Sequence, residues 1–140
     1  MAFKINVSLK GRTWKTETEN EGLIRMKIGE KIQGSMISGE LDGYQLEITG
    51  TSDQSGFPGI KGQVGGQLKR ILLTKADKGM NETRPHGLRL KKTVRGEEIS
   101  EKTSQINLIV LKEGAKKFDE VCPVKVKEKK VETKAETPAA

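Results

Sequence analysis

Short runs in which apolar and polar residues alternate are the feature that most restricts the fold of this chain. The clearest run covers residues 3–10, where every odd-numbered residue from Phe3 to Leu9 is apolar. A period of two places every second side chain on one face of a strand, whereas a helix needs a period near 3.6. We therefore expect a half-buried strand here, followed by a turn at Gly11 and a hairpin partner over 13–18.

Further segments favour strands on different grounds. Residues 44–48 alternate cleanly between two glycines, 68–74 form an apolar and basic run, and 105–111 form an apolar run. Residues 23–37 fit neither period well, and a strand over about 31–37 is preferred there because Gly29 and Gly34 argue against one long helix. Residues 93–95 are a candidate short strand. The six glycines and one proline within 50–66 predict a long loop instead. No segment shows a convincing amphipathic helical period. The chain is thus expected to be all-β, forming a small closed or partly open β-barrel of about six strands with long basic loops.

The chain length and the apolar content together predict one small domain. Of the 140 residues, 33% are apolar, and they concentrate before residue 120. We expect a barrel domain over 1–120 and a disordered, Lys/Glu-rich tail over 121–140, because the tail buries too little apolar surface to offset its ordering entropy. No apolar run approaches ~18 residues, and no apolar signal-peptide segment follows the first residue. A single cysteine also fits a reducing compartment, so the sequence predicts a cytoplasmic protein without a membrane partner.

Basic residues gather in the middle of the chain. Residues 61–95 carry ten basic and two acidic side chains, a net charge of +8, whereas residues 1–60 have a net charge of −1. A solvated surface usually mixes the two signs, and a block of one sign favours an anionic partner such as nucleic acid.

The segment 84–95 carries five basic residues and no acidic one. In an extended chain, Arg89, Lys91, Thr93 and Arg95 share one face at intervals of about 6–7 Å. A solvated loop is the alternative for a single basic run, but the basic residues upstream favour nucleic acid. The candidate RNA-binding residues are Lys61, Lys69, Arg70, Lys75, Arg84, His86, Arg89, Lys91, Lys92 and Arg95.

RNA is favoured over DNA for two reasons. The sequence has no helix-turn-helix or zinc-finger pattern to enter a major groove, and basic loops on a β scaffold suit recognition of RNA by shape and phosphate. Few aromatic residues are left for base stacking, which favours contacts with the RNA backbone over a single-strand platform.

The sequence offers no catalytic set. The glycine-rich loop lacks the Gly-Lys-Ser/Thr of a P-loop, Cys122 lacks a nearby partner, and Glu97, Glu98 and Glu101 are most simply a solvated turn. With one His and one Cys, the usual four-ligand zinc site cannot be assembled. We therefore expect no enzyme activity, no metal, no cofactor and no small-molecule substrate.

Residues 48–59, ITGTSDQSGFPG, resemble the signature of the six-e family of small-subunit ribosomal proteins of archaea and eukaryotes. The match lies at Ile48, Thr49, Gly50, Asp53, Gly56 and Pro58, and the sequence departs from the signature at Thr51 and Gly59. Downstream segments resemble the family in the same order: 68–74, Arg84-Pro85, 92–96 and 105–110. The resemblance covers roughly residues 3–120, without the long basic C-terminal helix of eukaryotic members.

This resemblance implies a β-barrel bound to small-subunit rRNA beside neighbouring ribosomal proteins, with a structural role in translation. The alternative is a regulatory RNA- or protein-binding barrel outside the ribosome. We expect the signature residues Gly50, Asp53, Gly56, Phe57 and Pro58 to shape a loop between two barrel strands. Gly56 would supply a positive φ angle there, and Pro58 would fix the chain direction.

Overall fold

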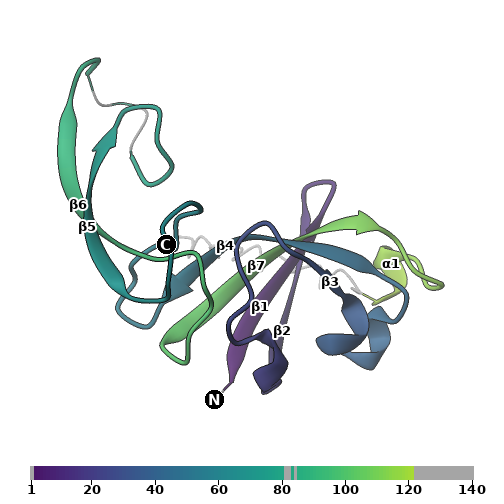
Figure 1. Cartoon of the computed structure of the whole chain (residues 1–140). Coiled ribbons are helices and arrows are strands. Elements are labelled where there is room, and N and C mark those ends of the chain that lie inside the picture. Colours follow the sequence, from purple (N-terminus) through teal and green to yellow (C-terminus); the bar gives the residue numbers. More distant parts are fainter. Residues whose placement is uncertain (1, 81–82, 84, 122–140) are drawn as a thin grey trace, which may run out of the picture.

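The computed structural model describes residues 2–80, 83 and 85–121, and within them the chain is built from strands (Figure 1). The strands are β1 (Phe3–Leu9), β2 (Arg12–Thr18), β3 (Lys31–Gln33), β4 (Gln45–Asp53), β5 (Leu68–Thr74), β6 (Arg89–Arg95) and β7 (Thr103–Lys112). Three 3-10 turns lie between β2 and β4: η1 (Glu21–Leu23), η2 (Gly34–Met36) and η3 (Gly39–Leu41). One short helix, α1 (Phe118–Val121), closes the described part.

Five of the strands form one mixed sheet in the order β2-β1-β7-β4-β3. The strands β1 and β7 run parallel, with Ile5 beside Ile106, and every other pair in this sheet is antiparallel. The central strand β7 therefore pairs with β1, which lies about a hundred residues earlier in the chain. The all-β class predicted from the alternating runs is confirmed.

The barrel predicted from the sequence is wrong, because the sheet is open. Within the described residues, the edge strands β2 and β3 pair only with β1 and β4. The ladder between β3 and β4 ends after three residues, where η2 begins at Gly34. The strands β5 and β6 pair with each other in a separate two-stranded sheet, so they do not bridge the two edges.

The core lies on one face of the five-stranded sheet, as the alternation of residues 3–10 predicts. Phe3, Ile5 and Val7 are at most 1% exposed. The same face receives Ile48 from β4 and Leu108 from β7, which are equally buried. Leu23, Leu41 and Ile99, from the 3-10 turns and the loop after β6, pack into the same cluster. Burying such side chains contributes about 1.5–3 kcal/mol each.

The chain after β7 contributes to this core. Phe118 and Val121 of α1 are buried with it, and the hydroxyl of Tyr44 donates a hydrogen bond to the carbonyl oxygen of Lys116. Burial raises the pKa of that hydroxyl, with smaller contributions from Glu113 and Glu120. The predicted boundary at residue 120 thus falls inside α1, and all of the predicted tail 121–140 except Val121 lies outside the described residues.

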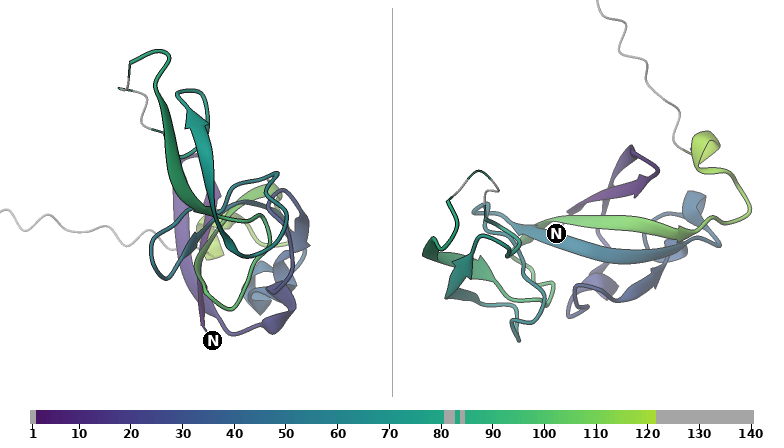
Figure 2. Two further views of the ribbon diagram at one scale, coloured as in Figure 1. Left: turned by 60° about the vertical axis from the view of Figure 1, so that its left-hand side comes forward. Right: turned by 90° about the horizontal axis from the view of Figure 1, so that it is seen from above.

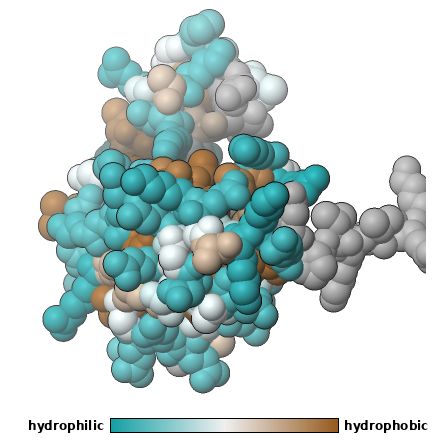
Figure 3. Space-filling model, turned by 90° about the vertical axis from the view of Figure 1, so that its right-hand side faces the viewer, coloured by the Kyte–Doolittle hydropathy of each residue, from teal (hydrophilic) through white to brown (hydrophobic). Residues whose placement is uncertain are grey.

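The hairpin of β5 and β6 stands away from the five-stranded sheet as an arm, seen from three directions in Figures 1 and 2. The strand β5 ends, and β6 begins, at the far end of this arm. Figure 3 shows one side of the molecule, where the surface is mainly hydrophilic with a few scattered hydrophobic residues. No helix in the described residues is long and apolar enough to cross a membrane.

Candidate nucleic-acid interface

One face of the arm presents positive charge. Residues directly opposite each other in an antiparallel pair project to the same side of the ribbon. We call this side the cationic face, and its exposed part consists of Arg70 opposite Thr93, Leu72 opposite Lys91 and Thr74 opposite Arg89. The side chains of Arg70, Arg89 and Lys91 are exposed. Arg89 and Lys91 lie about 6.6–6.8 Å apart along β6.

The opposite face of the arm carries four apolar residues and two lysines, Lys69 and Lys92, and is partly covered. It carries Leu73 and Val94, which are 4% and 1% exposed. The loop after β5 folds back over it, so that Gly79 lies beside both Leu73 and Pro58. The amino group of Lys92 donates to the carbonyl oxygen of Gly79 at 3.3 Å. Because this loop packs against one face of the ribbon, the cationic face is the one that remains exposed to solvent.

A leucine lies exposed in the middle of the cationic face. The run Ile71-Leu72-Leu73 predicts a buried segment, but only Leu73 is buried, and Leu72 is 52% exposed. Its neighbour across the ribbon is Lys91, and Arg70 is two residues before it on the same strand. The prediction failed because a two-stranded ribbon has one covered face, so consecutive residues cannot all be buried.

The remaining candidate cations lie around the arm rather than on this face. The amino group of Lys69 donates to the carbonyl oxygen of Val64 at 2.7 Å. Lys61 is exposed on the loop before β5, Lys75 is half-buried, and His86 is exposed. Arg84 lies outside the described residues. The candidates therefore do not form one cluster, and the cationic face brings together only three of them.

Arg95 differs from the sequence-based expectation. It follows the alternation of Arg89 and Lys91, but its side chain turns into the protein and is 7% exposed. One guanidinium nitrogen lies 2.6 Å from a carboxylate oxygen of Asp53, which is 2% exposed. The other terminal nitrogen donates to the carbonyl oxygen of Gly66 at 2.6 Å. The structure thus gives Arg95 an internal partner, because β6 ends where the arm joins the sheet.

The signature 48–59 forms this junction. Asp53 ends β4, and its backbone N–H donates to the carbonyl oxygen of Phe57 at 2.9 Å, closing a loop in which Gly56 has a φ of 85°. The carbonyl oxygen of Pro58 then accepts a hydrogen bond from the backbone N–H of Arg95 at 2.9 Å. Gly50 lies at a register shift within β4. The signature therefore connects the five-stranded sheet to the arm.

One carboxylate in the described part of the arm is committed to local structure. Asp77 accepts hydrogen bonds from the backbone N–H and the hydroxyl of Thr74 at 2.7 and 2.9 Å. These two bonds lower the pKa of Asp77. The carboxylate is thus charged at neutral pH and caps the end of β5, on a hairpin whose described charged side chains are otherwise cations.

Sequence reasoning missed the pairing of Asp53 with Arg95. Each residue sits in a different motif of the chain, 42 positions apart. Asp53 follows polar residues of the signature and Arg95 ends the basic run 84–95, so neither segment carries a signal of the pairing. Spacing alone cannot show that the two runs meet.

The chain matches a family model described as ribosomal protein S6e over residues 1–123. A small ribosomal subunit protein eS6 of Methanococcus maripaludis is 41% identical over 117 residues, which cover 82% of this chain and 91% of that protein. Its counterpart in Methanothermobacter thermautotrophicus is 40% identical over 124 residues, 86% of this chain and 95% of that protein. The protein of the same name in Encephalitozoon cuniculi is 35% identical over 122 residues, 84% of this chain and 56% of that protein.

Proposed function

The chain belongs to the ribosomal protein S6e family, and we propose that it holds a local fold of small-subunit rRNA by neutralising phosphates with the cationic face of its arm. Membership of this family makes the chain a structural, non-enzymatic component of the small ribosomal subunit, with a part in translation. The comparisons give no support to the alternative of a regulatory barrel outside the ribosome. The site of action we propose is the cytoplasmic ribosome, beside neighbouring ribosomal proteins.

The observation that carries this proposal is the exposure of Arg70, Arg89 and Lys91 on a ribbon whose other face is partly covered. A hairpin with seven cross-strand pairs fixes the backbone that carries these cations before any RNA arrives, so little backbone freedom remains to be lost on binding. Arg also offers two parallel donors to a phosphate. The spacing along β6 is comparable to the separation of successive phosphates on one RNA strand.

The remaining candidates take secondary roles in this proposal. Lys61, Lys69, Lys75 and His86 lie on the loops around the arm and would add charge near the RNA rather than fixed contacts. Lys92 and Arg95 are committed to internal partners, so we assign them to the shape of the arm.

The test is a salt series on binding of the full chain to a small-subunit rRNA fragment. The three cations of the cationic face and two or three of the surrounding loop cations would neutralise phosphates, so log affinity should fall against log salt with a slope of roughly −4, since each neutralised phosphate contributes about 0.7–0.9. Changing Arg70, Arg89 and Lys91 together to Gln should weaken binding and flatten the slope by about 2–3 units. The fold should persist, because these side chains are exposed.

The matched control removes three exposed cations away from the arm, Lys10 in the turn after β1, Lys15 in β2 and Lys31 in β3, and lowers the net charge equally. We expect this variant to keep nearly the slope of the unchanged protein. Equal losses for the two triple variants would mean that diffuse charge holds the RNA, and the assignment of the cationic face would then be withdrawn.

A further inference from the structure

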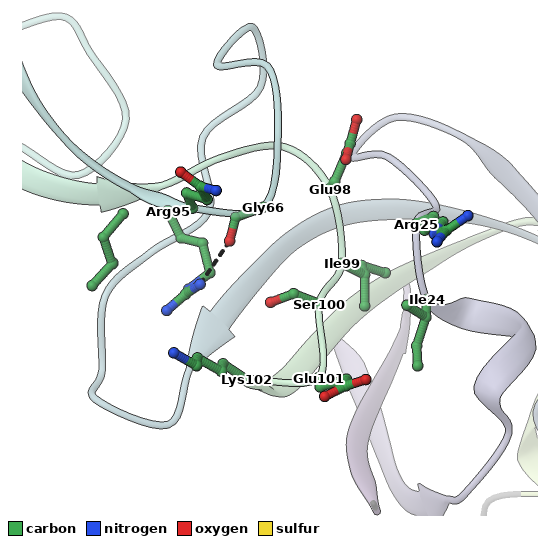
Figure 4. Close-up of a pocket in the computed structure, with 11 residues that line it drawn as sticks. Ile24, Arg25, Gly66, Arg95, Glu98, Ile99, Ser100, Glu101 and Lys102 are labelled. Atoms are coloured by element: carbon green, nitrogen blue, oxygen red, sulfur yellow. Dashed lines mark hydrogen bonds between the residues drawn. The ribbon is translucent and has the colours of Figure 1, made fainter.

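A pocket lies where the arm joins the sheet (Figure 4). Its volume is about 740 Å³, within the range of roughly 300–1,000 Å³ typical of small-ligand sites. It is formed by the end of β6 with the loop that follows, by the residues that lead into β5, and by Ile24 and Arg25 after η1. It therefore draws on three separate segments of the chain.

Hydrogen-bond donors gather on one side of this pocket. Among the described residues, the Nε atom of Arg95 and the hydroxyl of Ser100 are buried without a hydrogen-bond partner. In Figure 4 the side chains of Arg95, Ser100 and Lys102 lie on the same side of the loop after β6, whereas the carboxylates of Glu98 and Glu101 point away from it. A guanidinium only donates hydrogen bonds, so the group that satisfies this side must offer acceptors.

The rest of the pocket suits a flat, uncharged group. Ile24 and Leu68 contribute apolar surface, and Leu68 is 45% exposed. Asp53 already balances Arg95, and the carboxylates of Glu98 and Glu101 point away from the donors, which leaves Lys102 as the uncompensated lining cation on that side. A phosphate would use the donors but leave the exposed side chain of Leu68 uncovered, whereas a nucleobase offers acceptors at its edge and an apolar face.

The pocket is also continuous with the cationic face. Leu68 lies on the same side of β5 as Arg70 and Leu72, because alternate residues of a strand share a face. A nucleic-acid strand whose phosphates follow Arg70 and Lys91 would therefore reach the pocket at the base of the arm. This continuity favours RNA over a protein side chain as the occupant.

We propose that the junction pocket binds one nucleotide turned out of the RNA helix. Its acceptor atoms face Arg95, Ser100 and Lys102, and its base covers Leu68. The proposal rests on the proposed function, and it adds a site that recognises a base to a surface that otherwise contacts phosphates.

The first test compares two tryptophan substitutions on the loop before β5. Gln67 is exposed at the rim of the pocket, so an indole in Gln67→Trp would block entry. Val64 is 69% exposed and does not line the pocket, which makes Val64→Trp the matched control. We expect Gln67→Trp to bind the rRNA fragment about tenfold more weakly with an unchanged salt slope, and Val64→Trp to bind as the unchanged protein does.

Equal affinities for Gln67→Trp, Val64→Trp and the unchanged chain would overturn the pocket while leaving the proposed function intact, since the salt slope would remain. Loss of salt-dependent binding by the unchanged chain would overturn both.

The second test does not depend on how Gln67→Trp folds. A benzoylphenylalanine placed at position 67 is irradiated in reconstituted small subunits. Cross-links to a single unpaired nucleotide support the proposal, and cross-links to a neighbouring protein or to scattered rRNA positions overturn it. Removing the base of that nucleotide should then weaken binding of the unchanged protein about tenfold, but should cost Gln67→Trp little more.

Discussion

Asp53→Asn should destabilise the protein far more than the loss of a surface ion pair, which is usually worth about 0–1 kcal/mol. The carboxylate of Asp53 is 2% exposed, and its partner Arg95 is 7% exposed. The substitution keeps the side-chain shape and removes only the charge. The guanidinium, however, then stays buried without a counter-ion, and removing one partner of a buried pair costs about 3–5 kcal/mol.

A loss of this size is a large share of the total stability, since small domains unfold with about 5–15 kcal/mol. We would measure it by urea unfolding of the full chain, reading the midpoint and the slope together. A lower midpoint with an unchanged slope would show that stability fell without a change in the surface exposed on unfolding.

The double variant Asp53→Asn with Arg95→Met makes the reasoning testable in the opposite direction. It removes the buried cation, so it should be more stable than Asp53→Asn alone, although Gly66 loses the donor to its carbonyl oxygen. A loss below about 1 kcal/mol for Asp53→Asn, or a double variant less stable than both single ones, would refute this account of the junction.

Three further predictions concern the junction and its surroundings. Gly96→Ala should lower stability by more than about 1–3 kcal/mol, because a Cβ there would lie 1.6 Å from a neighbouring backbone oxygen; Gly50→Ala, with open space around its Cβ position, is the control in the same urea assay. The pKa of Glu97 is lowered, chiefly by the backbone N–H of Gly62, so its stabilisation is present above the ordinary pKa of 4.5 and is lost as the pH falls below it. Glu97→Gln should therefore reduce the acid dependence of the melting temperature between neutral pH and pH values below 4.5, and an identical dependence would contradict this. Phe57→Ala should cost less than the ~3–5 kcal/mol of a fully buried aromatic, since Phe57 is half-buried, and an unchanged melting temperature would assign its ring to RNA contact instead.

The strands in which apolar and polar residues alternate strictly were predictable from the sequence. A polar strand that pairs with an apolar strand was not, because its own residues show no such pattern. Residues 3–10 and 44–48 show their period of two directly, and their apolar residues pack in the core of the five-stranded sheet. The strand β6 begins at Arg89, four residues before the predicted run, because its polar start pairs with the apolar residues Ile71 and Leu72 of β5. A pattern confined to one segment cannot reveal what the opposite strand contributes.

Closure of the sheet and the role of Arg95 were beyond sequence reasoning for a related reason. Each depends on which distant segments contact each other. The short ladder between β3 and β4 leaves the sheet open, and the hydrogen bond from Arg95 to Pro58 brings Arg95 to the signature loop. The basic character of the arm was predictable, because charge adds along the chain. The division of its cations between exposed and internal positions was not, because the covering loop after β5 determines it.

The position of β7 at the centre of the sheet has a consequence for synthesis of the chain. β1 can form a local hairpin with β2 early. The strand β7 lies between β1 and β4 in the sheet, and it is translated after the whole arm. Contacts between distant segments slow folding, because the loop between them must close first. The apolar faces of β1 and β4 therefore remain unpaired until residues 103–112 have been synthesised. We expect the nascent chain to fold cooperatively only once it has reached that length. Chains ending before β7 should be sensitive to proteases, whereas chains reaching residue 121 should not.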